Sequence, residues 1–232
     1  MRKLKVLIAC EESQAECSAW RALGHSAFSC DVVQCRPSGN KAWHIRQDVT
    51  PLLKGNCFFT TQDGRRHFVR RWDLIIAHPP CTYLCKVGSP WLYKNPDWTF
   101  TFNDRQLEVN YDRLCLMKQA RAFFMLCLHA ECDYLAVENP IPMAIADLPR
   151  PTTYVCPSWY GVKYTKKTLY WLRNLPPPVP TIEYPNPKCY VHCSRGKYRS
   201  RTFPEMATAI AIQWNDYIQR EYDLDRVLHN EE

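Results

Sequence analysis

The tetrad His78-Pro79-Pro80-Cys81 and the tripeptide Glu138-Asn139-Pro140 contain the residue types of a nucleophilic site. Two successive prolines force an extended, stiff turn, which fixes the direction of the next side chain, Cys81. A cysteine attacks as a thiolate and needs a positive or hydrogen-bonding neighbour, which His78 or a nearby basic residue can supply. Glu138 can act as the acid–base partner of this thiol. Together the two side chains suit addition to an electron-poor ring such as a pyrimidine.

Each motif follows a short apolar segment that is typical of a buried strand, residues 74–77 before the tetrad and 134–137 before Glu138. In an open parallel sheet, side chains just past the carboxyl ends of strands converge on one crevice. We therefore expect Cys81 and Glu138 to face one shared pocket. Partial burial should raise the pKa of Glu138, so that it donates a proton to a ring nitrogen at neutral pH. A structural role for Cys81 stays open as the alternative, because the chain has 13 cysteines.

The first fifty residues have the layout of a nucleotide-cofactor half-fold. The expected elements are a strand at 4–10, a helix at 12–23, a strand at 27–30 and a short strand at 44–46. The second strand ends at Asp31 and the third ends near Asp48. An acidic residue at the tip of the second strand is part of this layout. The pattern predicts an α/β fold with a parallel sheet in one domain, residues 1–232.

The rest of the chain mixes regular elements with irregular segments. A polar hairpin or a loop insertion is expected within residues 51–72, with Asp63-Gly64 at its turn. Residues 86–103 form an aromatic, proline-containing loop that is long for a simple connection. Residues 140–200 are broken by prolines, which exclude regular structure at Pro176-Pro177-Pro178. The remaining expected elements are a helix at 104–130, a strand at 168–172 and a helix at 203–221.

The formal charge of the chain is +7, and its basic residues are grouped within 65–71, 163–173 and 195–201. Aromatic residues are interleaved with them. This combination suits the backbone and bases of a nucleic acid, so we expect a nucleic-acid partner. An ordinary solvated basic surface is the alternative. The apolar run 6–10 is too short for a signal peptide or a membrane span, which predicts a cytoplasmic protein with no membrane partner.

The cysteines are expected to stay reduced in the cytosol, most of them as small buried side chains. Cys81/Cys85 and Cys189/Cys193 have loose metal-ligand spacing, and His192 lies beside the second pair. Neither pair has a second half-site at a convincing distance. We therefore expect no metal ion.

Several segments together resemble DNA cytosine-5 methyltransferases, and most closely the short phage and prophage members. Ala77 to Cys81 resembles the Pro-Pro-Cys nucleophile loop of that family, and Glu138-Asn139-Pro140 resembles its Glu-Asn-Val motif. The other matching segments are Ala9 to Ser13, Thr82 to Leu84, Lys166 to Leu172, Leu175-Pro176-Pro177 with Pro180-Thr181, and Ser200 to Phe203. The resemblance implies a Rossmann-like S-adenosylmethionine-dependent methyltransferase fold. It would have a mostly parallel sheet, helices on both faces and a reduced target-recognition region.

The resemblance also implies a role for each matching residue. Cys81, positioned by Pro80, would add to C6 of cytosine, while Glu138 would hold N3 and the exocyclic amine. Asn139 would brace the Cys81 loop. The residues expected to bind S-adenosylmethionine are Asp31 at the ribose hydroxyls, Asp48 at the adenine amine, and Ala9, Cys10, Glu11, His78 and Pro79. The residues expected at the target base or the DNA are Lys166, Thr168, Arg199 and Arg201.

The implied substrate is DNA inside a bacterial host cell. Since the target carbon lies within a duplex, such enzymes flip the base out or act on single strands. Only residues 140–200 are available as a target-recognition element, which predicts weak sequence specificity. Residues 10–13 replace the glycines of the family's first loop. The alternatives are a related C5 modification of RNA or a nucleotide, and a non-catalytic binder of nucleic acid or cofactor. Both Cys81 and Glu138 are present, which favours an enzyme.

Overall fold

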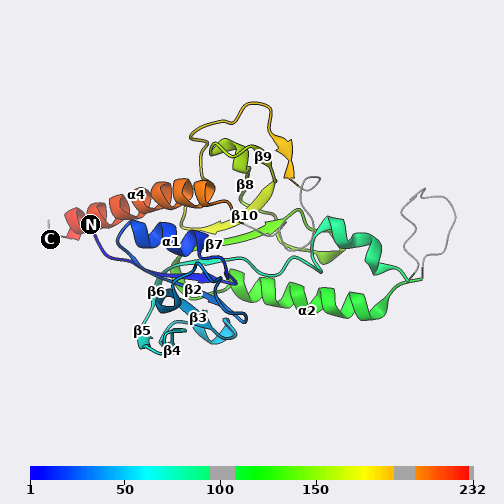
Figure 1. The fold of residues 1–232 in the computed structure, drawn as a ribbon, viewed down its shortest axis with the longest axis horizontal. Coiled ribbons are helices and arrows are strands. Elements are labelled where there is room, and N and C mark those ends of the chain that lie inside the picture. The colour runs from blue at the N-terminus through cyan, green and yellow to red at the C-terminus, as the bar shows by residue number, and fades with distance from the viewer. Residues whose placement is uncertain (95–107, 191–201, 230–232) are drawn as a thin grey trace.

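A seven-stranded sheet forms the centre of the computed structural model, which describes residues 1–94, 108–190 and 202–229 (Figure 1). In spatial order the strands are β3 (His44–Arg46), β2 (Ser26–Asp31), β1 (Lys5–Ala9), β6 (Trp72–Ala77), β7 (Cys132–Pro140), β10 (Thr168–Arg173) and β8 (Thr153–Val155). The five strands from β3 to β7 run parallel, whereas β10 is antiparallel to both of its neighbours. This confirms the expected α/β class with a mostly parallel sheet.

The direction in which the sheet grows reverses between β1 and β6. β2 and β3 extend it on one side of β1, while β6 and β7 extend it on the other. In open α/β sheets, ligands bind outside the carboxyl ends of the strands at such a point. Here the segments after the two strands meet directly, because the His78 N–H donates to the Ala9 carbonyl over 2.9 Å. The residues expected at the cofactor and in the nucleophile loop therefore share one edge of the sheet.

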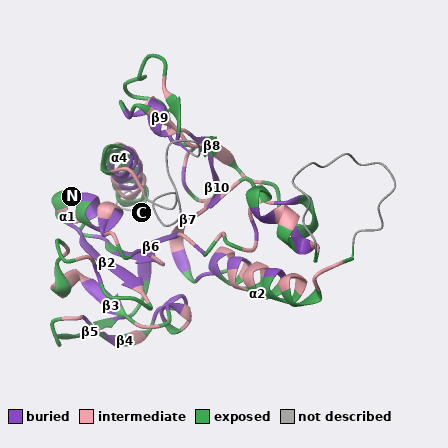
Figure 2. Ribbon diagram, turned by 45° about the vertical axis from the view of Figure 1, so that its right-hand side comes forward, coloured by how far each residue is buried: buried purple, intermediate pink, exposed green. Residues whose placement is uncertain are grey.

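Helices cover both faces of the sheet, as expected (Figure 1). Their bounds are α1 (Ala15–Ala22) and α4 (Pro204–His229) on one face, and α2 (Tyr111–Leu128) on the other. Side chains alternate between the faces along each strand. Ile8 of β1 therefore belongs to a buried cluster with Trp20 and Trp214, whereas Leu7 belongs to a second cluster with Phe124. Figure 2 shows the buried residues concentrated on the strands between these helix layers.

Two small ribbons and several short helices complete the described elements. The ribbons are β4 (Cys57–Thr60) antiparallel to β5 (Arg66–Val69), and β9 (Tyr164–Thr165) parallel to β11 (Lys188–Cys189). The first ribbon confirms the hairpin expected within residues 51–72. The short 3-10 helices are η1 (Lys41–Trp43), η2 (Thr50–Leu52), η3 (Lys86–Leu92), η4 (Ala144–Ala146) and η5 (Pro157–Trp159).

The three long helices differ in their bounds from the expected ones. α1 begins only at Ala15, because Gln14 has a left-handed φ of 60°, which no helix continues through. α2 begins after Asn110, whose side chain caps its first turn, and the expected helical residues 104–107 lie outside the described part. α4 continues past the expected end at residue 221. None of the helices in the described ranges has the length and apolar character needed to cross a membrane.

The strand that carries Glu138 is longer than expected. Glu138 was placed just past its tip, but β7 continues to Pro140, because β10 pairs with it as far as Thr168 opposite Pro140. β6, the parallel neighbour of β7, ends at Ala77. The antiparallel neighbour β10 therefore supplies the backbone hydrogen-bond partners for the last residues of β7. The strand expected at 168–172 is confirmed as β10. The proline-rich region 140–200 is more regular than expected, since it also contributes β8 to the main sheet and the ribbon of β9 and β11.

Candidate active site

His78 lies between two carboxyl groups that reach it from different elements. Ala77 of β6 pairs with Val137 of β7, so the next residues along these parallel strands, His78 and Glu138, are neighbours on one face. That face is the one covered by α1, whose first turn carries Glu16. Nε2 of His78 lies 3.1 Å from Oε2 of Glu16, and Nδ1 lies 3.5 Å from Oε2 of Glu138. Two strands and one helix therefore converge on a single imidazole.

The two contacts fix the charges of the group. Burial lowers the pKa of His78, but the charge of Glu16 and the hydrogen bond to Glu138 outweigh it, so that this pKa is well above 6.5. For Glu138 the effects are reversed. Burial raises the pKa of its carboxyl group, but the hydrogen bond to His78 and the charge of Lys166 outweigh burial and bring this pKa below 4.5. The expected rise in the pKa of Glu138 is therefore wrong, because the imidazolium beside it stabilises the carboxylate. At neutral pH the pair is an imidazolium and a carboxylate.

Glu11 adds a further buried carboxyl group beside this pair. Its side chain accepts the N–H groups of Glu16 over 2.8 Å and Cys17 over 3.3 Å, so it occupies the amino end of α1. Burial, followed by the nearby charge of Glu16, raises the pKa of Glu11 to about 7, although His78 opposes the rise. Glu11 was expected at the cofactor. Its carboxyl group binds the amino end of the helix that presents Glu16 to His78.

Cys85 follows Cys81 by one turn in the segment after β6, and its backbone N–H donates to the Cys81 carbonyl over 3.0 Å. The side chain of Cys85, burial and the charge of Glu138 raise the pKa of Cys81, whereas Lys166 lowers it. The side chain of Cys81 lowers the pKa of Cys85 to about 6, and backbone N–H groups of the η3 turn add to this against the opposing effect of burial. Of the two thiols, Cys85 is therefore the more acidic. The positive neighbour of Cys81 is expected to be His78 or a nearby basic residue. Both ring nitrogens of His78 contact carboxyl groups, and the charge that lowers the pKa of Cys81 is that of Lys166.

Asn139 connects the Glu138 strand to the nucleophile loop. The side chain is fully buried, and its Nδ2 donates to the carbonyl of Pro79 over 3.3 Å. This is the bracing contact that the resemblance implies. It couples the end of β7 to the two prolines that hold Cys81.

Lys166 and Thr168 lie where β10 meets the end of β7. Lys166 is close enough to Cys81 and Glu138 to lower the pKa of both. Thr168 is only 1% exposed, and its hydroxyl donates to the Lys166 carbonyl over 3.1 Å. It therefore positions Lys166, and its burial does not favour the expected contact with a base. The expected DNA contacts Arg199 and Arg201 lie outside the described residues.

The expected cofactor residue Asp31 ends β2, and Asp48 follows the adjacent strand β3 at the same edge of the sheet. Asp31 Oδ1 accepts the Val33 N–H over 3.1 Å, and Asp48 Oδ1 accepts the N–H of Thr50 over 2.8 Å. Burial raises the pKa of Cys10, and the charges of Asp31 and Asp48 raise it further. The first loop and both carboxylates are thus close in space. Carboxylates in this arrangement suit a ligand with hydroxyl and amino groups, such as a nucleoside.

The first loop makes a sharp turn without glycine. Cys10 and Gln14 have left-handed φ values of 61° and 60°, a conformation that costs a non-glycine residue on the order of 1–2 kcal/mol. The Gln14 side chain holds the turn, since it bonds the Ser29 hydroxyl over 3.1 Å and both backbone groups of Asn40. Strained backbone of this kind clusters at ligand sites. The loop therefore retains a tight turn in place of the family's glycines.

Two residues of the site, Glu16 and Cys85, are not among the expected ones. Glu16 has a weak signal, an acidic residue in the first turn of a predicted helix, which is common on helix surfaces. Cys85 has a stronger signal, because it follows Cys81 by four residues, the spacing of one closed turn. Among the described residues, no group of three His, Cys, Asp or Glu side chains is placed to hold a metal ion.

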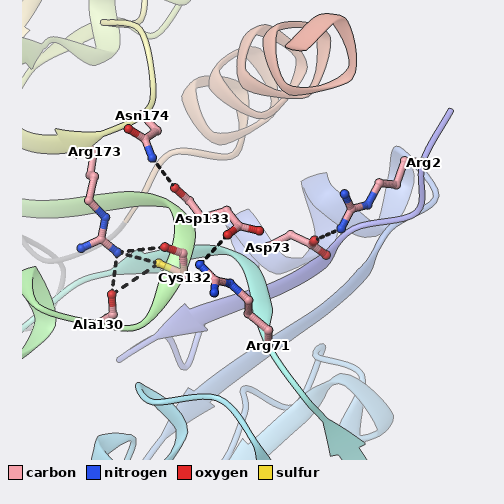
Figure 3. Close-up of polar contacts among 8 residues, drawn as sticks. All are labelled: Arg2, Arg71, Asp73, Ala130, Cys132, Asp133, Arg173 and Asn174. Carbon is pink, nitrogen blue, oxygen red and sulfur yellow. Dashed lines mark hydrogen bonds and ion pairs between the residues drawn. The ribbon is translucent and has the colours of Figure 1, made fainter. Parts of the chain in front are cut away.

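Part of the expected basic surface lies at the opposite edge of the sheet (Figure 3). Arg173 ends β10, which runs antiparallel to β7, and its guanidinium donates to the carbonyls of Ala130 and Cys132. Arg71 forms an ion pair with Asp133 over 2.6 Å, beside a hollow of about 360 Å³. These arginines bind the protein's own backbone and acidic groups. The hollow is remote from Cys81, so we place the candidate active site at the other edge.

Replacing Arg173 with methionine is expected to lower the free energy of unfolding by about 1–3 kcal/mol, because buried carbonyls lose charged donors. Denaturant unfolding would measure this change. Lys167→Met, an exposed basic position at the active-site edge, is the matched control and should cost less than about 1 kcal/mol. Oligonucleotide affinity should fall only for Lys167→Met. Weaker binding by Arg173→Met at unchanged stability would contradict this assignment.

Comparison of the chain with protein-family models gives no match, and a search of curated proteins gives no significant match. Function is therefore inferred from the chemistry of the residues at the carboxyl edge of the sheet. Those residues are a thiol with a more acidic cysteine beside it, a carboxylate held by an imidazolium, and a lysine whose charge acts on both the Cys81 thiol and the Glu138 carboxylate.

Proposed function

We propose that this protein transfers a methyl group from S-adenosylmethionine to C5 of cytosine in DNA, through a covalent adduct at Cys81. The observation that carries the proposal is the meeting of Cys81, Glu138 and Lys166, since the charges of the latter two both act on the Cys81 sulfur. The likeness of the nucleophile loop and the Glu-Asn segment to cytosine-5 methyltransferases supports this chemistry. A mostly parallel sheet with helices on both faces is compatible with a methyltransferase fold.

Cys81 is the nucleophile of the proposed reaction. Its thiol must lose a proton before attack, and its hydrogen-bond partner Cys85, with a pKa of about 6, can accept that proton. The proton moves from Cys81 to Cys85 as the Cys81 sulfur bonds to C6 of the ring. Lys166 stabilises the negative charge on Cys81 during this step. When the sulfur leaves C6 at the end of the reaction, Cys85 returns the proton.

Glu138 recognises and polarises the base. One carboxyl oxygen accepts a hydrogen bond from the exocyclic amine, while the protonated form of the group donates to N3. Protonation of N3 withdraws electrons from C6, so that thiolate addition becomes favourable and C5 gains electron density. Bound S-adenosylmethionine supplies an electrophilic methyl group to C5. The C5 proton then passes to solvent water as the Cys81 sulfur leaves C6, which restores the aromatic ring.

The residues that would hold the cofactor are Asp31, Asp48 and the loop from Ala9 to Glu11. The carboxylates lie at the carboxyl ends of adjacent strands and match the hydroxyl and amino groups of an adenosine. The left-handed turn at Cys10 gives the loop the tight path that a glycine would otherwise provide. This set lies at the point where the sheet reverses its growth, beside the nucleophile loop.

The DNA would approach over the segment that leads into β10. Lys163 and Lys167 are exposed there and lie over aromatic rings, with Lys167 Nζ 4.1 Å from the ring centroid of Tyr154 and Lys163 Nζ 5.4 Å from that of Tyr164. Lysines bind phosphates, and aromatic rings stack on bases. This arrangement suits a single strand or a base flipped out of a duplex.

Trapping on 5-fluorocytosine tests the proposal. Fluorine at C5 cannot leave as a cation after methyl transfer, so the sulfur stays bonded to C6. We expect a covalent complex that requires S-adenosylmethionine, with peptide mass spectrometry placing the adduct on Cys81. Duplex DNA, single-stranded DNA and RNA that carry the analogue form the parallel samples.

The outcomes separate the alternatives. An adduct on RNA alone would move the substrate from DNA to RNA. Binding of oligonucleotide and cofactor without an adduct on any sample would indicate a non-catalytic binder. Calorimetry that detects no S-adenosylmethionine binding, together with no adduct, would rule out methyl transfer.

A further inference from the structure

Glu138 lacks the proton that its proposed role requires. In the resting protein the group is a carboxylate, because His78 and Lys166 lower its pKa below 4.5 against the effect of burial. A carboxylate can accept from the exocyclic amine of cytosine, but it cannot donate to N3. A proton must therefore reach Glu138 when the base binds. His78 is in direct contact with it and carries one.

We propose that His78 supplies this proton: it leaves Nδ1 of His78 for Oε2 of Glu138 and passes from that carboxyl group to N3 of the base. The role rests on the proposed methyl transfer. His78 acts through Glu138 and is therefore a positioning residue and proton store. When the sulfur leaves C6, N3 returns the proton to Glu138 and so to His78. The proton balance of the store is thus restored in each cycle.

The contacts of His78 suit this role. Its Nδ1 lies 3.5 Å from Glu138 Oε2, and its Nε2 lies 3.1 Å from Glu16 Oε2. The Glu16 contact holds the ring and keeps the positive charge favourable before the base arrives. After Nδ1 gives up its proton, Nε2–H still donates to Glu16. The ring therefore needs no reorientation, and the side chain is only 14% exposed, which excludes most competing water.

Titratable groups from each element packed against His78 and Glu138 face this pair. The facing groups are Glu11 and Glu16 at the amino end of α1, Lys166 and Cys81 beside Glu138, and Tyr170 on β10. Tyr170 is neutral because burial, followed by the charges of Glu16 and Glu138, raises its pKa far above 10. Three carboxyl groups thus surround one imidazole and one lysine. A positive charge on His78 is the state that this arrangement stabilises.

His78→Gln is the test, with single-turnover methyl transfer measured from about pH 6 to about pH 9. Glutamine keeps a hydrogen bond but carries no proton to give. We expect a rate at least about 100-fold below wild type at pH 8, rising about tenfold per unit of acidification, because Glu138 must then take its proton from water. Wild type should change far less with pH above about pH 7, where Cys85, with its pKa of about 6, can still accept the Cys81 proton. His129→Gln, an exposed histidine at the far edge of the sheet, is the matched control and should behave as wild type. Parallel profiles of wild type and His78→Gln would overturn the inference.

Glu16→Gln provides a second variant, which keeps the imidazole and removes one of its two carboxyl partners. At low pH, Glu16→Gln should transfer methyl groups at the wild-type rate. As the pH rises, the rate of the variant should begin to fall at a lower pH than the rate of wild type. Histidine NMR gives a readout that needs no activity: the His78 ring should remain protonated at pH 8 in wild type and titrate earlier in Glu16→Gln. Titration of wild-type His78 near the ordinary value of about 6.5 would contradict the proposal.

Failure of the inference and failure of the proposed function are distinguishable. If wild type transfers no methyl group at any pH and traps no 5-fluorocytosine, the methyltransferase proposal fails and the inference fails with it. If wild type is active while His78→Gln keeps the wild-type pH profile, only the role of His78 is lost.

Discussion

Cys81→Ala is expected to abolish both methyl transfer and trapping on 5-fluorocytosine, while the protein stays folded. No other described group shares the position of this sulfur beside Glu138 and Lys166. Loss of the covalent step should lower kcat on the order of 10⁴-fold or more. Radiolabelled methyl transfer and denaturing gels would measure the two effects. Cys81 lies half-buried in a loop, so we expect a change in unfolding free energy of less than about 1 kcal/mol.

Cys115→Ala is the matched control for this variant. Cys115 is exposed on α2 and takes no part in the site, so the same substitution there should leave the adduct and the rate unchanged. Cysteine chemistry at Cys81 would be excluded if Cys81→Ala retained a rate within about tenfold of wild type at equal cofactor affinity.

Glu138→Gln is expected to lower kcat by about 10² to 10⁴-fold with little change in KM. A glutamine amide can still accept from the exocyclic amine and donate to N3, so the base remains bound, but it transfers no proton. Steady-state kinetics on an oligonucleotide would separate the two parameters. An unchanged kcat would show that no proton passes through this position.

The same variant should change stability in a defined pH window. Glu138 has a pKa below 4.5 in the folded protein, so its ionised form contributes stability above that pH, and this contribution is lost as the pH falls through the folded-state pKa. The stability advantage of wild type over Glu138→Gln should therefore shrink below about pH 4.5. Urea unfolding at pH 7 and pH 4 would measure it. In Glu138→Gln, the pKa of His78 should also fall, because one of its two partners is neutral.

The parallel half of the sheet was predictable because continuous apolar runs identify strands buried on both faces. Residues 74–77 are all buried within β6, as expected. The end of β7 was not predictable in this way. Glu138 and Asn139 are in a strand only because β10 pairs with them, and that pairing depends on contacts distant in sequence.

The candidate site was predictable where a local motif carries it. The Pro-Pro turn, Cys81 and Glu138 were found from strand context, and Asn139 makes the contact that the resemblance implied. The charge state of Glu138 was not predictable, because it depends on an imidazole held from a third element by Glu16. Helix periodicity cannot reveal that an acidic residue in a first turn faces a histidine 62 residues away.

The alternation that fills the two cores also aims His78 and Glu138 toward α1. A single-residue insertion or deletion within β7 before Glu138 would rotate the carboxylate to the α2 face, while apolar side chains would turn toward the wrong helices. One such mutation would therefore remove both the catalytic arrangement and the packing of the two cores. Among descendants of this chain, insertions and deletions should therefore be confined to the segments outside the strands. Changes within the strands should be limited to substitutions.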